Sequence, residues 1–173
     1  MSQVSFENRT VIVTGAGNGL GKAYALDLGS RGAKVVVNDL GGAVDGSGSG
    51  STPADEVVNE IIANGGEAVA NYDSVATKEG GESIVQTAID NFGTVDAVVN
   101  NAGILRDKSF ANMSEEELSL IIDVHLKGTF FVSQPAFKVM KENAYGRIVN
   151  VASPSGLFGN FGQSNYGAAK MGI

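Results

Sequence analysis

Three side chains near the end of the chain, Ser153, Tyr166 and Lys170, are of the types needed to move a proton and hold a substrate oxygen. Tyr166 and Lys170 are four residues apart and therefore share one face of a helix. A phenol is a weak base at neutral pH, but a neighbouring ammonium and a cationic nicotinamide both favour the phenolate, which accepts an alcohol's proton as hydride leaves. A serine hydroxyl can hydrogen-bond the same oxygen. The set predicts hydride exchange between nicotinamide and a secondary alcohol or ketone.

This interpretation depends on further motifs, because a Tyr-x-x-x-Lys pair is common on helix surfaces and serine in a Ser-Pro-Ser-Gly run is common in turns. Residues 14–21 read Thr-Gly-Ala-Gly-Asn-Gly-Leu-Gly, directly after a β-branched run and before a helical stretch. In that context glycines let the backbone approach a pyrophosphate, and the helix N-terminus offers free N–H groups. The alternative is a tight turn alone. We expect dinucleotide binding by Gly15, Gly17, Asn18, Gly19, Leu20 and Gly21.

Asp39 stands at the end of the second β-branched run, 18 residues after Gly21. An acidic side chain about 20 residues past such a loop hydrogen-bonds the adenosine ribose. It also repels a 2′-phosphate, and the loop has Asn18 in place of a basic residue that would compensate. We therefore predict NAD rather than NADP. The alternative is that Asp39 only begins the glycine turn that follows it.

Two further segments belong near this crevice. Asn100-Asn-Ala-Gly103 follows the fourth β-branched run and should flank the nicotinamide half of the cofactor, although such a tetrapeptide also forms turns. His125, the only histidine, lies within a predicted long helix, where it serves either a structural hydrogen bond or catalysis. A Ser-His-Asp hydrolase is disfavoured because the chain has no Gly-x-Ser-x-Gly motif.

The elements that position these residues alternate between short strands and helices. Continuous β-branched runs predict strands covered on both faces, and apolar periodicity predicts helices between them. A capping box at residues 114–117 starts the longest helix. The pattern predicts an α/β fold, a doubly wound parallel sheet in one three-layer, Rossmann-like NAD-binding domain spanning residues 1–173, with its ligand beyond the carboxyl ends of the strands. We expect strands at residues 10–14, 34–38, 68–71, 95–100 and 147–151, and helices at 20–30, 54–64, 81–92, 114–141 and from 165 onward.

Two segments depart from this rhythm. Residues 41–51, Gly-Gly-Ala-Val-Asp-Gly-Ser-Gly-Ser-Gly-Ser, are flexible by composition, so we expect a mobile surface loop there. The last helix stops after about two turns. We therefore expect the C-terminal part of the domain to be missing after Ile173.

Composition limits the classes of function. A net charge of -7 argues against nucleic-acid binding. The lack of cysteine excludes disulfides, a thiolate zinc site and a cysteine nucleophile, and it fits a cytoplasmic protein with no metal. No apolar run approaches the length of a membrane span, and the polar first residues are unlike a signal peptide. We expect neither a nucleic acid nor a membrane as partner.

In order and spacing, these motifs resemble the short-chain dehydrogenase/reductase family. Longer stretches are similar to one branch, the (3R)-hydroxyacyl-CoA dehydrogenase modules of peroxisomal multifunctional enzymes type 2 and their stand-alone bacterial relatives. These stretches are residues 35–42, 70–75, 100–107 and 156–163. Two features depart from the family's pattern. An asparagine usually stands where this chain has His125, and family members continue well past the position of Ile173.

The resemblance implies oxidation of a (3R)-3-hydroxyacyl-CoA to the 3-oxoacyl-CoA in fatty-acid β-oxidation, with NAD as cofactor. It implies a homodimer or homotetramer, which in a eukaryote is peroxisomal. Catalysis would involve Ser153, Tyr166, Lys170 and His125, with Ser153 and Tyr166 contacting the substrate. The implied cofactor contacts are Asp39 at the ribose, Asp73, Ser74 and Val75 at the adenine, and Asn100, Ala102, Gly103, Tyr166 and Lys170 along the remainder.

Three alternatives stay open. The first is a 3-oxoacyl carrier-protein reductase that uses NADPH, against which Asp39 counts. The second is a hydroxysteroid dehydrogenase. The third is a non-catalytic dinucleotide-binding module, which the intact set of Ser153, Tyr166 and Lys170 disfavours.

Overall fold

Five β-branched runs form one parallel sheet in the computed structural model, which describes residues 4–173. The chain moves outward from β1 to β3 and then returns to β4, so the switch point of this doubly wound sheet lies between β1 and β4. The structure confirms the predicted α/β class and places each strand within two residues of its expected limits. The strands are β1 (Thr10–Thr14), β2 (Lys34–Asn38), β3 (Glu67–Asn71), β4 (Ala97–Asn100) and β5 (Arg147–Asn150), in the order β3-β2-β1-β4-β5.

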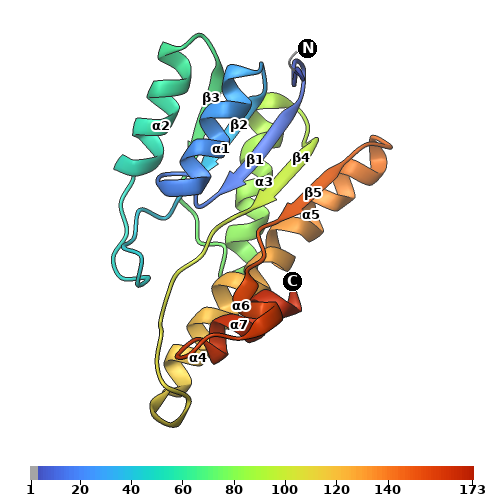
Figure 1. Cartoon of the computed structure of the whole chain (residues 1–173). Coiled ribbons are helices and arrows are strands. Elements are labelled where there is room, and N and C mark those ends of the chain that lie inside the picture. The colour runs from blue at the N-terminus through green and yellow to red at the C-terminus, as the bar shows by residue number, and fades with distance from the viewer. Residues whose placement is uncertain (1–3) are drawn as a thin grey trace.

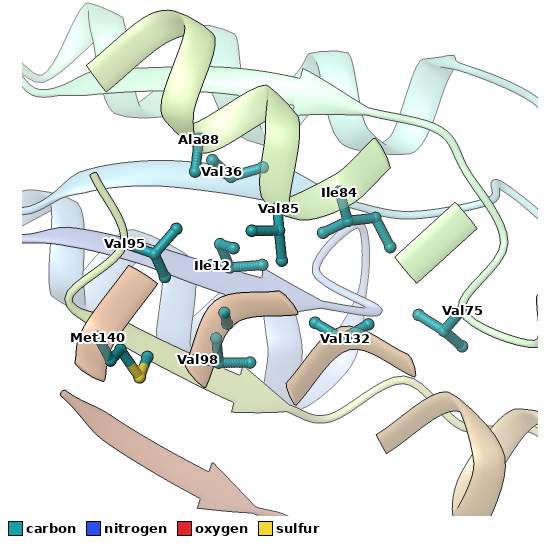
Figure 2. Close-up of a cluster of buried hydrophobic side chains, with 11 residues drawn as sticks. Ile12, Val36, Val75, Ile84, Val85, Ala88, Val95, Val98, Val132 and Met140 are labelled. Carbon is teal, nitrogen blue, oxygen red and sulfur yellow. The ribbon is translucent and has the colours of Figure 1, made fainter. Parts of the chain in front are cut away.

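Helices cover both faces of the sheet (Figure 1). α1 (Gly19–Ser30) and α2 (Thr52–Ala63) pack on one face, and α3 (Lys78–Phe92) and α5 (Gly128–Glu142) pack on the other. The strand register places Ile12 beside Val36 and Val98, so these three side chains point together toward α3 and α5. Burial of this apolar surface stabilises the fold by about 25 cal/mol for each Å² removed from water. It thereby fixes β1 and β4, and with them the loops at their carboxyl ends. Figure 2 shows the strand residues packed against Ile84, Val85, Val132 and Met140.

The prediction of a single long helix over residues 114–141 is wrong in one respect, because the helix is interrupted. α4 (Glu115–Ile121) begins with the predicted capping box, in which the side chains of Ser114 and Glu117 each accept a hydrogen bond from the other's backbone N–H. The next six residues, Ile122–Lys127, form a π-helical segment, η2, before α5 begins. Such segments are rare and concentrate at functional sites. This one carries His125.

Beyond β5 the chain forms two short helices, α6 (Pro154–Phe158) and α7 (Ser164–Gly172). With α4 they lie past the carboxyl ends of the strands (Figure 1). Sequence reasoning predicts only a loop where α6 stands. Ser153 caps this helix, with its Oγ accepting a hydrogen bond from the Ser155 N–H at 3.2 Å, and Pro154 occupies its first turn. A 3-10 turn, Phe110–Asn112, precedes α4.

Residues 41–51 lie at the surface, as expected, but they fold back on themselves. The Ala43 N–H donates to the Ser47 carbonyl at 2.8 Å, and the Gly50 N–H donates to the Leu40 carbonyl at 2.9 Å. The segment is therefore a closed turn whose two ends are bonded together.

None of the helices in residues 4–173 combines the length and apolar character that crossing a bilayer requires. α3 and α5 have 15 residues each. A membrane-spanning helix needs about 20.

Candidate active site

A cavity of about 380 Å³ lies beyond the carboxyl ends of the strands, where the doubly wound topology predicts a ligand. Its walls come from the loops that follow β1, β2, β3 and β4, with Leu120 and Val124 closing one side. Segments far apart in the sequence therefore converge on one site. The predicted cofactor residues that line this cavity are Gly15, Asn18, Gly19, Asp39, Asp73, Ser74, Val75, Ala102 and Gly103.

The glycine loop carries the chain from β1 into α1 along a path that excludes larger residues. Gly15 has a φ of +62°, and a Cβ on it would lie 2.8 Å from the Ala102 Cα. A Cβ on Gly21 would collide with the Gly15 carbonyl and would lie 2.6 Å from the Asn101 amide nitrogen. At Gly19, by contrast, a Cβ would meet no atom of residues 4–173 within 4 Å outside the adjoining backbone. The loop is packed tightly against the protein and open on the side of the cavity.

The first turn of α1 presents free N–H groups at this opening. Asn18 occupies the N-cap but makes no side-chain capping bond within the described chain, and the first turn contains no acidic residue. Free N–H groups and the positive end of a 12-residue helix attract an anion. A pyrophosphate fits this cradle. Leu20 does not line the cavity, and its side chain is 62% exposed.

Asp39 is held at the end of β2 by two backbone N–H groups. Gly17 donates to Oδ2 at 2.8 Å, and Gly41 donates to Oδ1 at 2.7 Å. The carboxylate thus joins the glycine loop to the turn after β2, and each oxygen keeps a second lone pair for a ribose hydroxyl. A Cβ on Gly17 would lie 2.8 Å from the Asp39 Cγ. Gly17 therefore serves the site by letting the carboxylate approach the loop.

The segment after β3 forms the wall facing Asp39. The Asp73 carbonyl accepts a hydrogen bond from Asn38 Nδ2 at 2.9 Å, and its carboxylate accepts from Ser83 Oγ at 2.7 Å and from Asn71 Nδ2 at 2.9 Å. These bonds direct the carboxylate toward α3. Val75 is buried against the start of α5, where a Cβ on Gly128 would lie 3.0 Å from it. The two buried asparagines that fix this wall are absent from the predicted set.

The residues of the Asn-Asn-Ala-Gly motif have separate roles. Asn100 Nδ2 donates to Asn150 Oδ1 at 2.8 Å and to Ser133 Oγ at 2.9 Å, so this side chain joins β4 to β5 and α5 instead of lining the cavity. Asn101 Nδ2 donates to the Thr14 carbonyl at 3.0 Å, and Asn101 lines the cavity. Thr14 Oγ1 accepts from two backbone N–H groups, those of residues 101 and 102, at 3.1 Å each. Asn101 and Thr14 are missing from the predicted site, although both stand inside its motifs.

α6, which Ser153 caps, packs closely on α7, which carries Tyr166 and Lys170. A Cβ on Gly156 would lie 2.9 Å from the Met171 nitrogen, and a Cβ on Gly167 would lie 2.8 Å from the Ser155 carbonyl oxygen. Two glycines thus permit the contact that brings the serine loop to the tyrosine helix.

Lys170 is buried beside the ring of Tyr166. Its Nζ donates to the Val151 carbonyl at 2.6 Å and lies 5.8 Å from the centre of the ring. Desolvation disfavours the ammonium and lowers the pKa of Lys170 from its ordinary value. The bond to the Val151 carbonyl therefore fixes the cation near the Tyr166 ring.

His125 also packs against the ring of Tyr166. The two rings meet edge to face, with their centroids 5.1 Å apart. His125 Nε2 lies 2.8 Å from the carbonyl oxygen and 3.1 Å from the amide nitrogen of Ile104, and Nδ1 is buried with no hydrogen-bond partner within residues 4–173. Burial outweighs the bond to Ile104 and, with the charge of Lys170, lowers the pKa of His125 to about 4. A neutral ring that is hydrogen-bonded to the backbone favours the structural role expected for His125 over the catalytic one.

The family model described as short chain dehydrogenase matches residues 9–173. The peroxisomal hydratase-dehydrogenase-epimerase of Saccharomyces cerevisiae is 61% identical over 170 residues, 98% of this chain and 19% of that protein. The peroxisomal multifunctional enzyme type 2 of Mus musculus is 58% identical over 172 residues, 99% of this chain and 23% of that protein.

A solved structure gives the same result. The crystal structure of a short chain dehydrogenase from Mycobacterium avium superimposes with a TM-score of 0.88 at 49% identity, covering 96% of this chain and 62% of that one. The chain therefore spans less than two thirds of the length of each of these relatives.

Proposed function

This chain belongs to the short-chain dehydrogenase family, and we propose that it oxidises a (3R)-3-hydroxyacyl-CoA to the 3-oxoacyl-CoA with NAD. The observation that carries the proposal is the placement of Tyr166. Its ring lies 5.8 Å from Nζ of the buried Lys170 and 5.1 Å from the ring of the neutral His125, which is bonded to Ile104 in the cavity wall. The cofactor of the family is a nicotinamide dinucleotide, and the glycine cradle, open at Gly19, fits its pyrophosphate.

Each catalytic side chain has one task in this reaction. A nicotinamide bound in this site would accept the hydride of the carbinol carbon. Tyr166 Oη takes the proton of the alcohol oxygen, and the ammonium of Lys170 favours the phenolate that does so. Ser153 Oγ accepts a hydrogen bond from the Ser155 N–H, which leaves its own proton to donate to the substrate oxygen. The alcohol loses one hydride and one proton and becomes a ketone.

Asp39 supports NAD rather than NADP. Its carboxylate is fixed by Gly17 and Gly41 at the end of β2, where the adenosine ribose of a dinucleotide lies in this fold. A ribose hydroxyl can donate to either oxygen, whereas a 2′-phosphate meets a negative charge. The NADPH-dependent reductase is therefore the less favoured alternative.

The substrate and location come from the relatives. The yeast and mouse relatives are both named as peroxisomal enzymes, and the name of the yeast protein includes a dehydrogenase. These names favour a peroxisomal location over the cytoplasmic one that the lack of cysteine indicates. By the same resemblance, we propose that the chain acts as one NAD-binding unit within a homodimer or homotetramer.

A substrate panel tests the proposal. Full-length protein is mixed with NAD or NADP and with a (3R)-3-hydroxyacyl-CoA, its 3S enantiomer or a hydroxysteroid, and the near-ultraviolet absorbance of reduced nicotinamide is followed. We expect turnover of the 3R thioester with NAD and little with its enantiomer. Faster turnover of the steroid, or a preference for NADP, would overturn the assignment. Binding of NAD without turnover of any alcohol would leave only a dinucleotide-binding module.

A further inference from the structure

Three consecutive residues after β4 are bonded to three different parts of the molecule. The backbone of Ile104 meets His125 Nε2, at 2.8 Å from the carbonyl oxygen and 3.1 Å from the nitrogen. The next N–H, of Leu105, donates to the Val44 carbonyl at 2.9 Å. The Arg106 carbonyl accepts from Asn165 Nδ2 at 3.1 Å. We call Ile104–Arg106 the coupling segment because two of these bonds lead to Tyr166 and the third leads to the cofactor cavity.

Asn165 connects the coupling segment to the catalytic helix. This residue is only 1% exposed, and its Nδ2 donates to the carbonyls of Arg106 and Glu117 at 3.1 Å each. Its Oδ1 accepts a hydrogen bond from the Tyr166 N–H at 2.8 Å. Both amide protons and the oxygen are thus engaged, which fixes the first turn of α7. Because His125 packs on the ring, the backbone and the ring of Tyr166 both depend on the coupling segment.

On the cavity side, the coupling segment supports the turn formed by Leu40–Gly50, which we call the glycine strap. Several strap residues line the cofactor cavity together with Ile104. Besides the bond at Val44, the strap touches the segment at Gly46, where a Cβ would lie 2.9 Å from the Ile104 Cδ1. A glycine-rich turn deforms more readily than the strand ends around it. A ligand in the cavity therefore meets a deformable wall that rests on Ile104 and Leu105.

We propose that Ile104–Arg106 couples occupancy of the cofactor cavity to the placement of Tyr166. A dinucleotide that draws the strap onto the segment also secures its bonds to His125 and Asn165. These two side chains are then positioning residues that act through Tyr166. The proposal rests on the proposed function only in that the cavity takes a dinucleotide. Since coupling between sites is reciprocal, a disturbance at Asn165 must in turn weaken NAD binding.

Amide hydrogen exchange tests this without any substrate. The reporters are the N–H of Leu105, bonded to the strap, and the N–H of Tyr166, bonded to Asn165. We expect NAD to slow exchange at both positions in the full-length protein. In the Asn165→Ala variant, saturating NAD should lose its protective effect at Leu105 as well as at Tyr166. Unchanged protection of Leu105 in this variant would overturn the coupling, because the bond from Asn165 to the Arg106 carbonyl would then have no effect on the neighbouring contact with the strap.

Two strap variants provide a matched pair. Gly46 and Gly48 both have positive φ, +83° and +74°, so alanine strains either position. Only the Cβ at Gly46 meets Ile104, whereas at Gly48 no atom of residues 4–173 lies within 4 Å. We expect Gly46→Ala to disturb the protection of Tyr166 at saturating NAD and Gly48→Ala to leave it as in the natural protein. Equal effects of the two changes would refute the role of this contact.

Steady-state kinetics adds a second readout. A displacement of about 1 Å in a catalytic group costs about 100-fold in rate, so we expect Asn165→Ala to lower kcat at saturating NAD by at least about tenfold and to raise the KM for NAD. An increase in KM with unchanged kcat would contradict the positioning role. If no alcohol is turned over while the exchange results stand, the substrate assignment fails and the coupling remains.

Discussion

Replacing Asp39 with asparagine should change the choice of cofactor while the fold is kept. The two carboxylate oxygens each accept one backbone N–H, from Gly17 and Gly41. Asparagine has the same shape but only one oxygen, so one N–H loses its acceptor. An unpaired buried donor costs about 1–3 kcal/mol, and a hydrogen bond to a charged group contributes about 1.5–3 kcal/mol. Asp39 is half-buried, which places both effects near the lower ends of these ranges.

The unpaired N–H destabilises the loop with and without NAD, so the loss of affinity comes from the weaker bond to the ribose. We therefore expect NAD to bind about 10- to 100-fold more weakly, since about 1.4 kcal/mol is a factor of ten. The same substitution also removes a repulsion that weakens the binding of NADP. Unit charges about 4 Å apart repel by about 1 kcal/mol in water and about 4 kcal/mol at an effective dielectric constant of 20, and asparagine removes this repulsion. Disturbance of the loop affects both cofactors and cancels in the ratio of their affinities. The preference for NAD over NADP should fall by at least about tenfold.

Titration calorimetry with each cofactor measures this ratio. Asp45→Asn is the matched control, because Asp45 carries the same charge on the neighbouring strap but, within residues 4–173, accepts hydrogen bonds only from the Ser47 N–H and Oγ, at 2.9 and 2.6 Å. The control should keep the natural preference. If both variants shift the ratio equally, the effect is one of net charge. An unchanged ratio in Asp39→Asn would refute the assignment of this carboxylate to the ribose.

Two further predictions concern the histidine and the glycine loop. Because the pKa of His125 is about 4 in the folded chain, below its ordinary 6.5, the unfolded chain binds more protons between these values and stability falls as pH decreases through that window. The loss of stability from this difference in pKa is at most about 3 kcal/mol. The melting temperature of the natural protein should therefore fall more steeply between pH 6.5 and 4 than that of His125→Asn. Parallel melting curves against pH would contradict the buried neutral ring. Gly21→Ala should abolish NAD binding in calorimetry, because the new methyl group collides with the Gly15 carbonyl, and retained affinity would disprove that packing.

Elements that depend on local sequence could be predicted. The strands follow from uninterrupted β-branched runs, and the start of α4 follows from Ser114 and Glu117, whose capping bonds span three residues. Part of the glycine loop could be placed from local causes, because Gly15 has a φ of +62° and a Cβ on Gly21 would collide with the carbonyl of Gly15, six residues away. In each case the cause and the structure lie within a few residues of each other.

Other features depend on contacts between distant segments and have no local signal. η2 breaks the register of a helix whose apolar spacing continues through it, and His125 within it bonds Ile104, 21 residues away. Composition predicts that residues 41–51 lack structure of their own, yet the bond from Leu105 to Val44 holds them over the cavity. α6 has its signals in Ser153 and Pro154 but is too short, at five residues, to show periodicity.

The site illustrates the same division. Residue types and spacing single out Tyr166 and Lys170 as candidates, because the proposed chemistry requires a shared helical face. They do not identify Asn165, whose partners Arg106 and Glu117 lie 59 and 48 residues away. Nor do they reveal that the Asn100 side chain joins β4 to β5, since an asparagine beside a crevice has the same sequence signature in either role.

The proton acceptor is tested most directly by a single-turnover comparison of the natural protein with Tyr166→Phe, at saturating NAD and a (3R)-3-hydroxyacyl-CoA. Phenylalanine keeps the ring against His125 and removes only Oη. Positioned proton transfer contributes about 100- to 10,000-fold, so we predict that the rate of nicotinamide reduction falls by at least about 100-fold while NAD still binds. A rate in Tyr166→Phe close to that of the natural protein would contradict the transfer of the alcohol proton to Tyr166.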